Sequence, residues 1–350
     1  MTITILTGCC LSILSTLASQ SVNTCVTSPP YFGLRDYGQA GQIGLEQTPE
    51  EFVSKLVGVF REVRRVLRDD GTLWLNLGDS YAGSWGNYGG QNRGQGTQRQ
   101  IVTGSLAPQK AYEGKEAWRP PTANKMQGIK NKDLIGIPWR VAFALQADGW
   151  YLRSDIIWHK PNPMPESVTD RPTKAHEYIF LLSKSETYYY DHHAIKEPFA
   201  DERMGNPGQY RKTSAGERKA CNDRQDGGFL NNGGGWNADG TTTGRNKRTV
   251  WTVSTKPFRE AHFATFPPGL IEPCILAGCP EGGTVLDPFF GAGTTGLVAD
   301  RHRRHCVGIE LNPEYVAIAE KRLGMPSPLV TEASKAPEPV VIQSPQLCLF

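Results

Sequence analysis

The chain has 350 residues and carries 38 basic and 35 acidic side chains, which gives a formal net charge of +3. A hydrophobic fraction of 38% is enough for a core, and the length fits one large domain or two ordinary ones. No stretch of about 18 apolar residues occurs, which argues against a membrane-spanning protein. Eight widely spread cysteines argue against a disulfide scaffold.

The apolar N-terminus superficially resembles a targeting signal. Leu6 to Cys9 spell a lipoprotein-like cleavage box, but only five residues precede Leu6 and no basic residue occurs before Arg35. A signal peptide needs a basic region and an apolar region ahead of such a box. We therefore expect a buried strand over residues 3–6, a short helix over 10–18, and reduced thiols in a cytoplasmic protein.

The next elements alternate between strand and helix. Residues 22–27 form an apolar run that predicts a buried strand. Apolar residues then repeat every three or four positions over 49–68, which predicts a helix. Thr48 and Glu51 have the spacing of a capping box, so the helix is expected to begin there.

The rest of the predicted order is typical of an α/β protein. A turn is expected at Asp70–Gly71, and it leads into a predicted buried strand at 72–77. Further strands are expected at 151–158, 177–182, 284–286 and 305–309, and further helices at 134–148, 267–278, 294–303 and 313–323. Apolar strands that alternate with helices indicate a parallel sheet covered on both faces.

Two irregular segments interrupt this pattern and hold most of the positive charge. Residues 81–131 contain 7 basic and 2 acidic side chains, and residues 196–250 contain 10 and 7. The rest of the chain is acidic, with 21 basic against 26 acidic side chains. Basic, glycine-rich loops on an acidic body favour a nucleic-acid surface, and plain solvated loops are the alternative. The candidate contacts are Arg211, Lys212, Arg245, Lys247 and Arg248.

The segment from Asp287 to Thr295 has the composition of a cofactor loop. It lies between a predicted strand and a predicted helix, and Gly291 and Gly293 let the backbone approach a ligand at the helix N-terminus. Glu310 ends the next strand, 17 residues past Gly293, where an acid can accept both hydroxyls of a ribose. This order predicts a nucleoside-cofactor site, and a structural turn with an incidental Glu310 is the alternative.

A second motif, Thr27 to Tyr31, follows the strand predicted at 22–27. Two consecutive prolines after a buried strand fix a rigid bend, which holds the Ser28 hydroxyl and the backbone carbonyls at the carboxyl edge of the sheet. The ring of Tyr31 can lie face-on to a planar partner. The alternative is a plain Pro-Pro turn with a packed tyrosine.

Together these motifs resemble the bacterial and phage DNA amino-methyltransferases, which use S-adenosylmethionine to modify cytosine-N4 or adenine-N6. Ser28, Pro29, Pro30 and Tyr31 look like the family's catalytic tetrapeptide, (Asp/Asn/Ser)-Pro-Pro-(Tyr/Phe/Trp). Asp287 to Gly293 looks like its Phe-x-Gly-x-Gly loop with a preceding Asp-Pro. The catalytic motif comes first and the cofactor motif last, which is similar to the permuted, beta-type order. The resemblance covers roughly 1–80, 132–195 and 250–323.

The resemblance implies a Rossmann-like α/β methyltransferase sheet with helices on both faces and irregular DNA-recognition insertions. It implies that the Ser28 hydroxyl and the Pro29 carbonyl accept hydrogen bonds from the target amine, while Tyr31 stacks on a base flipped out of double-stranded DNA. The segment from His262 to Phe266 resembles the one that completes the cofactor pocket. The implied cofactor-binding residues are Asp287, Phe289, Gly291, Gly293, Thr294, Glu310, His262 and Phe266.

Serine at position 28 favours cytosine-N4 over adenine-N6 as the target, because the adenine enzymes more typically have aspartate there. The alternatives are an adenine-N6 DNA methyltransferase, an amino-methyltransferase that acts on RNA or protein, and a non-enzymatic DNA-binding protein. Asp36 is a candidate general base, with water as the alternative acceptor of the product's proton. One departure from the family is Gly8–Cys9, where an aspartate usually follows the glycine and reaches the adenine of the cofactor.

The predicted organisation follows these motifs. It comprises a catalytic half (1–80), a basic DNA-facing insertion (81–131), a continuation of the core (132–195), a target-recognition region (196–250), a cofactor-binding half (251–323) and a flexible tail (324–350). The tail ends in Gln346–Phe350, which resembles the pentapeptide that binds the bacterial sliding clamp. Cys274 and Cys279 lack a second pair, so no metal site is predicted. The expected location is the cytoplasm of a bacterium or of a phage-infected cell.

Overall fold

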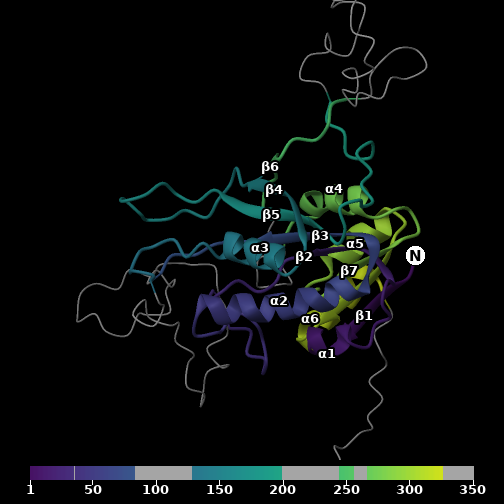
Figure 1. Ribbon diagram of the computed structural model, residues 1–350, viewed down its shortest axis with the longest axis horizontal. Coiled ribbons are helices and arrows are strands. Elements are labelled where there is room, and N and C mark those ends of the chain that lie inside the picture. Colours follow the sequence, from purple (N-terminus) through teal and green to yellow (C-terminus); the bar gives the residue numbers. More distant parts are fainter. Residues whose placement is uncertain (35, 83–127, 199–243, 256–265, 326–350) are drawn as a thin grey trace, which may run out of the picture.

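The computed structural model describes residues 1–34, 36–82, 128–198, 244–255 and 266–325 (Figure 1). These residues form one eight-stranded sheet in the order β1-β8-β7-β2-β3-β5-β4-β6, with helices on both faces. The strands are β1 (Ile3–Thr7), β2 (Val22–Thr27), β3 (Leu67–Leu77), β4 (Tyr151–His159), β5 (His176–Ser183), β6 (Val250–Thr252), β7 (Thr284–Asp287) and β8 (His305–Glu310). The helices are α1 (Cys10–Leu14), α2 (Pro49–Val66), α3 (Ile137–Ala147), α4 (Pro268–Gly278), α5 (Thr294–Arg301) and α6 (Pro313–Leu323).

The sheet is parallel except at β5, which runs antiparallel to both of its neighbours, β3 and β4. The remaining strand pairs are all parallel. The expectation of a parallel sheet is therefore wrong at one strand, β5. The reason is that a parallel neighbour needs a crossover, usually a helix, whereas residues 160–175 between β4 and β5 contain no helix.

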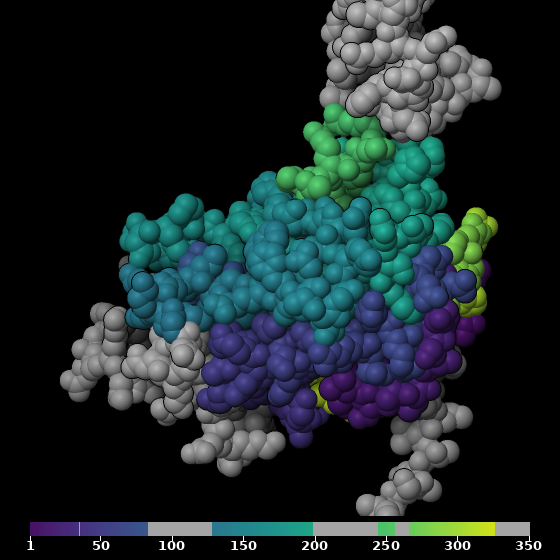
Figure 2. All heavy atoms as spheres, viewed as in Figure 1, coloured from purple at the N-terminus to yellow at the C-terminus, as the bar shows by residue number. Residues whose placement is uncertain are grey.

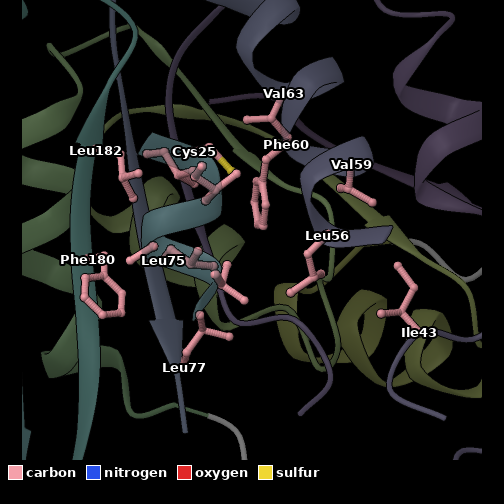
Figure 3. Close-up of a cluster of buried hydrophobic side chains, with 14 of the residues drawn as sticks. Cys25, Ile43, Leu56, Val59, Phe60, Val63, Leu75, Leu77, Phe180 and Leu182 are labelled. Carbon is pink, nitrogen blue, oxygen red and sulfur yellow. The ribbon is translucent and has the colours of Figure 1, made fainter. Parts of the chain in front are cut away.

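Two hydrophobic clusters lie on opposite faces of this sheet. Helices α1, α2 and α3 bury their apolar residues in one cluster, and α4, α5 and α6 bury theirs in the other. In the close-up of the first cluster, Leu56 and Phe60 of α2 point toward Leu75 and Cys25 of the sheet (Figure 3). In the space-filling view, the segment 128–198 lies directly against the segment that contains α2 (Figure 2). No helix in the described ranges combines the length and apolarity that a bilayer crossing needs.

Helix α2 begins where its capping residues predict. The Thr48 hydroxyl accepts a hydrogen bond from the Glu51 backbone N–H at 3.2 Å. The Glu51 carboxylate accepts the N–H of Gln47 at 3.1 Å, one residue earlier than in a standard capping box. Both contacts give partners to backbone N–H groups around the helix start, where an α-helix cannot pair its own first donors.

Strand β3 begins at Leu67 and not after a turn at Asp70–Gly71, as the sequence predicted. Leu67 pairs with Val22 and Thr72 pairs with Thr24, so the residues between them in β3 bulge out of the ladder. Of these residues, Arg68 to Asp70 are exposed and Gly71 is buried. The buried Leu67 can still pair with Val22 of β2, because the bulge accommodates the residues of β3 that have no partner in β2. Helix α1 ends at Leu14 and not at residue 18, and α3 begins at Ile137 and not at residue 134.

We predict that Gly308→Ala will disrupt the cofactor-loop side of the sheet. A Cβ atom at position 308 would lie 2.4 Å from two ring atoms of Phe290, whose side chain is buried. The free energy of unfolding should fall by about 1–3 kcal/mol, which is typical of overpacking in a core. Denaturant titration measures this value directly. As the control, Gly58→Ala in α2 has no atom within 4 Å of the added carbon and should raise it by about 1 kcal/mol. Equal stabilities for the two variants would contradict the packing argument.

Candidate active site

The predicted motifs meet along one edge of the sheet. Strands β8, β7, β2 and β3 are parallel neighbours, so the loops that follow them leave from the same edge. Ser28 follows β2, the glycine loop follows β7, and Glu310 ends β8. In open α/β sheets, ligands bind in the crevice outside the carboxyl ends of the strands. The structure thus brings the catalytic and cofactor motifs together, although they lie at opposite ends of the chain.

A buried carboxylate joins the two motifs. The Thr27 hydroxyl donates to Asp287 Oδ1 at 2.7 Å, and the Thr295 hydroxyl donates to Asp287 Oδ2 at 2.6 Å. The Phe289 N–H also donates to Oδ1, at 3.1 Å. Asp287 has no exposed surface, so its carboxylate supports the loop from beneath. We interpret Asp287 as a positioning residue of the predicted cofactor site.

Burial also changes the chemistry of this carboxyl. Removal from water raises the pKa of Asp287 to about 6, although the hydrogen bonds from Thr27 and Thr295 act in the opposite direction. The Glu310 carboxylate adds a smaller upward contribution to the pKa of Asp287. The folded protein therefore holds the ionised form of Asp287 at a cost in stability.

The glycine loop leaves room above its backbone. Gly291 and Gly293 have φ angles of 51° and 76°, in the region that favours glycine. A Cβ atom at Gly291 would find no atom within 4 Å, so the space beside the loop is open. Gly293 is the N-cap of α5 and makes no side-chain cap, and the helix N-terminus carries partial positive charge. The Thr294 hydroxyl turns inward and accepts a hydrogen bond from Arg322 Nη1 at 2.9 Å.

Glu310 is tied to the loop by backbone hydrogen bonds. Its Oε2 accepts the Gly291 N–H at 2.7 Å, and its Oε1 accepts the Asn312 N–H at 2.8 Å. Burial raises the pKa of Glu310, and these backbone donors act against that rise. A carboxylate has about four lone-pair sites, so each oxygen can still accept a ribose hydroxyl. The open loop and this carboxylate together fit a nucleoside cofactor.

Packing anchors the predicted catalytic loop on both sides of its prolines. Thr27 and Pro29 are buried, while Ser28 and Pro30 are half-buried. Phe32 follows in the core, with its ring 5.5 Å from that of Phe52 in α2. The bend is therefore held between β2 and α2.

The Tyr31 side chain sits in a polar cluster that the sequence did not reveal. Its hydroxyl donates to Glu177 Oε2 at 2.6 Å and lies 3.2 Å from Asn76 Oδ1. Its ring lies against Gly78, where a Cβ atom would be only 2.5 Å from Tyr31 Cε2. Lys160 forms an ion pair with Glu177. The sequence gives one sign of this cluster, because Glu177 is a charged residue at the start of the apolar strand predicted at 177–182.

Three basic candidates surround one carboxylate. Arg245, Lys247 and Arg248 place a nitrogen 3.5, 3.8 and 3.0 Å from the carboxylate oxygens of Glu197. Lys247 Nζ also lies 5.0 Å from the centre of the Trp251 ring. The cluster keeps two net positive charges. The other named candidates, Arg211, Lys212 and His262, and the pentapeptide Gln346–Phe350 lie outside the described residues.

The remaining candidates have separate places. Phe266 is half-buried against the α4 side of the sheet, and Phe289 packs against the opposite cluster.

Cys9, at the position of the family's usual aspartate, is the exposed N-cap residue of α1. Asp36 accepts a hydrogen bond from the Gly38 N–H at 2.7 Å. Cys274 and Cys279 are buried thiols whose pKa values are raised by burial.

The chain is similar to known proteins along most of its length. A family described as DNA methylase matches residues 22–321. The Type II methyltransferase M.Cfr9I of Citrobacter freundii is 50% identical over 321 residues, which cover 91% of this chain and 87% of that protein. The Type II methyltransferase M.SmaI of Serratia marcescens is 46% identical over 310 residues, covering 88% and 86%.

Solved structures share the fold. The PvuII DNA methyltransferase (cytosine-N4-specific) superposes with a TM-score of 0.58 at 19% identity, covering 95% of this chain and 89% of that one. TTHA0409 from Thermus thermophilus, complexed with S-adenosyl-L-methionine, superposes with a TM-score of 0.51 at 22% identity, covering 92% and 95%.

The raised pKa of Asp287 predicts a pH-dependent contribution to stability. Because the folded value of about 6 lies above the ordinary 3.8, the ionised group destabilises the folded state. The contribution of Asp287 to the free energy of unfolding should therefore fall as pH rises from about 4 to about 6. Relative to Asp287→Asn, the unchanged protein should lose about 1 kcal/mol between about pH 5 and about pH 7. Urea titration at each pH measures the difference, with Asp300→Asn at an exposed site as the control. A constant difference between the two proteins would contradict the assignment.

Proposed function

Because the chain belongs to the DNA methylase family and is an S-adenosylmethionine-dependent, site-specific DNA methyltransferase of the N4/N6 class, we propose that it methylates cytosine at N4. Ser28, at the first position of the catalytic tetrapeptide, is the observation that carries this proposal. Its hydroxyl is uncharged and follows β2 at the edge where the motifs meet. The PvuII enzyme, named as cytosine-N4-specific, has the same fold, so this fold can serve that base.

The cofactor would lie over the glycine loop. The backbone at Gly291 and Gly293 would face it, Glu310 would accept its ribose hydroxyls, and Phe266 and His262 would complete the pocket. When bound, S-adenosylmethionine supplies an electrophilic methyl group on a sulfonium. Asp287 acts indirectly by holding the loop in place through Thr295 and the Phe289 N–H.

The catalytic loop would prepare the amine for attack. An exocyclic amine is conjugated with its ring, so its lone pair is a poor nucleophile. If the Ser28 hydroxyl and the Pro29 carbonyl each accept one amine hydrogen, the nitrogen can become tetrahedral and aim its lone pair at the methyl group. Pro30 stiffens the bend that presents both acceptors. This is catalysis by positioning and by preorganised hydrogen bonding, without a covalent enzyme intermediate.

The target base would have to leave the duplex to reach this edge. Base flipping costs a few kcal/mol, and stacking on an aromatic ring contributes about 1–3 kcal/mol in return. Tyr31 would supply that ring. Tyr31 is half-buried, so part of this residue is accessible at that edge.

The double-stranded DNA would contact the basic insertions. Arg245, Lys247 and Arg248 would face phosphates, because they outnumber the single carboxylate of Glu197 among them. Arg211 and Lys212 are proposed contacts on residue type alone.

We also propose that Gln346–Phe350 binds a bacterial sliding clamp and that the enzyme acts in the cytoplasm, where its DNA and cofactor are found.

The identity of the modified base tests the proposal directly. DNA methylated by the purified enzyme and digested to nucleosides should contain N4-methylcytosine when analysed by mass spectrometry. Ser28→Ala should lower kcat by about 100-fold, the usual scale for losing one preorganised hydrogen-bonding group. Its KM for S-adenosylmethionine should change little, which provides the matched control. N6-methyladenine without N4-methylcytosine would overturn the assignment to cytosine.

A second experiment tests the basic cluster. Alanine at Arg245, Lys247 and Arg248, with Glu197→Gln to avoid an unpaired carboxylate, should weaken DNA binding. The slope of log affinity against log salt should fall by about 2–3, one for each lost phosphate contact. Arg68→Ala, in the exposed bulge at the amino end of β3, is the control and should leave the slope unchanged. If the quadruple variant kept the original slope of log affinity against log salt, the DNA would have to contact residues other than these three.

A further inference from the structure

We propose that Glu177 is a positioning residue for methyl transfer, which holds the Tyr31 ring through its hydroxyl and so sets where the target base stacks. Lys160 completes this arrangement by holding Glu177. The inference rests on the proposed stacking role of Tyr31. It adds two residues that neither the tetrapeptide nor the cofactor loop contains.

The antiparallel direction of β5 brings Glu177 to the site. The carboxyl end of β3 pairs with the amino end of β5, and Leu77 lies opposite Tyr178. Glu177 therefore lies beside the residue that follows β3, which is Gly78. Had β5 run parallel to β3, its first residues would lie at the far edge of the sheet. Lys160 directly follows β4, whose last residues pair with the first residues of β5.

The contacts of Glu177 divide between its two oxygens. Oε2 accepts the Tyr31 hydroxyl at 2.6 Å, a length typical of a charge-assisted O–H···O⁻ bond. Oε1 pairs with the Lys160 ammonium. Asn76 Nδ2 donates to the Tyr178 carbonyl at 3.0 Å, which turns the amide oxygen toward Tyr31. Each group in the cluster thus has a defined partner.

The ion pair is shielded from water. The side chains of Lys160 and Glu177 are only 19% and 15% exposed. Lys160 Nζ also lies 4.2 Å from the centre of the Trp158 ring, a cation–π distance. A shielded pair is weakened less by solvent and salt than a surface pair, so it can hold the carboxylate in one orientation.

The Tyr31 ring is restrained at two places. Its hydroxyl is tethered to Glu177, and its edge rests on Gly78, where any larger residue would collide with the ring. Burial and the neighbouring Glu177 carboxylate raise the pKa of Tyr31, so the hydroxyl stays protonated and remains a donor at neutral pH. A ring already fixed in its stacking orientation loses less freedom when the base arrives, which favours the reactive complex.

A double-mutant cycle tests the proposal on the full-length protein. Glu177→Gln and Tyr31→Phe should each lower kcat/KM for DNA by about tenfold and change KM for S-adenosylmethionine by less than about twofold. In the Tyr31→Phe background, Glu177→Gln should cause no further loss, because the tether is already gone. Duplexes with 2-aminopurine at the target position provide a second readout. Their fluorescence on enzyme binding should be higher with either variant, because the flipped base stacks less well.

The controls separate this inference from the function on which it rests. Glu62→Gln breaks the Glu62–Arg65 pair on α2 and should leave both readouts unchanged. Thermal melting of every variant identifies any loss that comes from unfolding. An equal effect of Glu177→Gln with tyrosine or phenylalanine at position 31 would overturn the positioning role. Tyr31→Ala alone could lose activity while Tyr31→Phe and Glu177→Gln keep the kcat/KM of the unchanged protein. This result would overturn the role of the hydrogen bond to Glu177 but would keep the stacking role of the Tyr31 ring. Full activity of Tyr31→Ala would overturn the stacking role itself.

Discussion

The hydrogen bonds of one buried carboxylate connect the two predicted motifs of the candidate active site. Asp287 binds the hydroxyl of Thr27, which directly precedes the catalytic loop, and that of Thr295, in the first turn of α5. The two bonded residues Thr27 and Asp287 are 260 positions apart in the sequence. The carboxylate therefore fixes the distance between the proposed amine acceptors and the cofactor loop. Burying it without partners would be prohibitively unfavourable, so the threonines and the acid depend on one another.

The reversed direction of β5 brings charged residues to the edge of the sheet where the predicted motifs meet. Where all strands run in parallel, an edge receives only carboxyl ends and the loops that follow them. Here β5 runs the other way and adds its amino end, with the shielded Glu177–Lys160 pair, beside Tyr31. The site thus combines a neutral serine and a glycine loop with an ionic pair that does not belong to either motif.

Part of this site could be predicted from the sequence, because it depends on interactions between residues that are close together in the chain. The Thr48 cap, the glycine loop, Glu310 and the Pro-Pro bend depend on neighbouring residues, and their elements lie where their patterns predicted. Strand order, the direction of β5 and the bulge before Gly71 depend on pairing between distant segments, which no local pattern encodes. The cluster of Glu177 and Lys160 was missed for the same reason. The Glu197 partner of the basic residues lies about 50 residues before them and was also invisible.

The strand order also determines when the sheet can be completed during synthesis of the chain. Strands β1 and β2 are consecutive in the chain, yet β8 and β7 lie between them in the sheet. A growing polypeptide therefore holds an open slot beside β2 until residues 284–310 leave the ribosome. Closing this slot joins segments that are far apart along the chain, which is a slow kind of folding step. A chain that ended before residue 284 would therefore contain the Pro-Pro bend after β2 but neither β7 nor the glycine loop beside it.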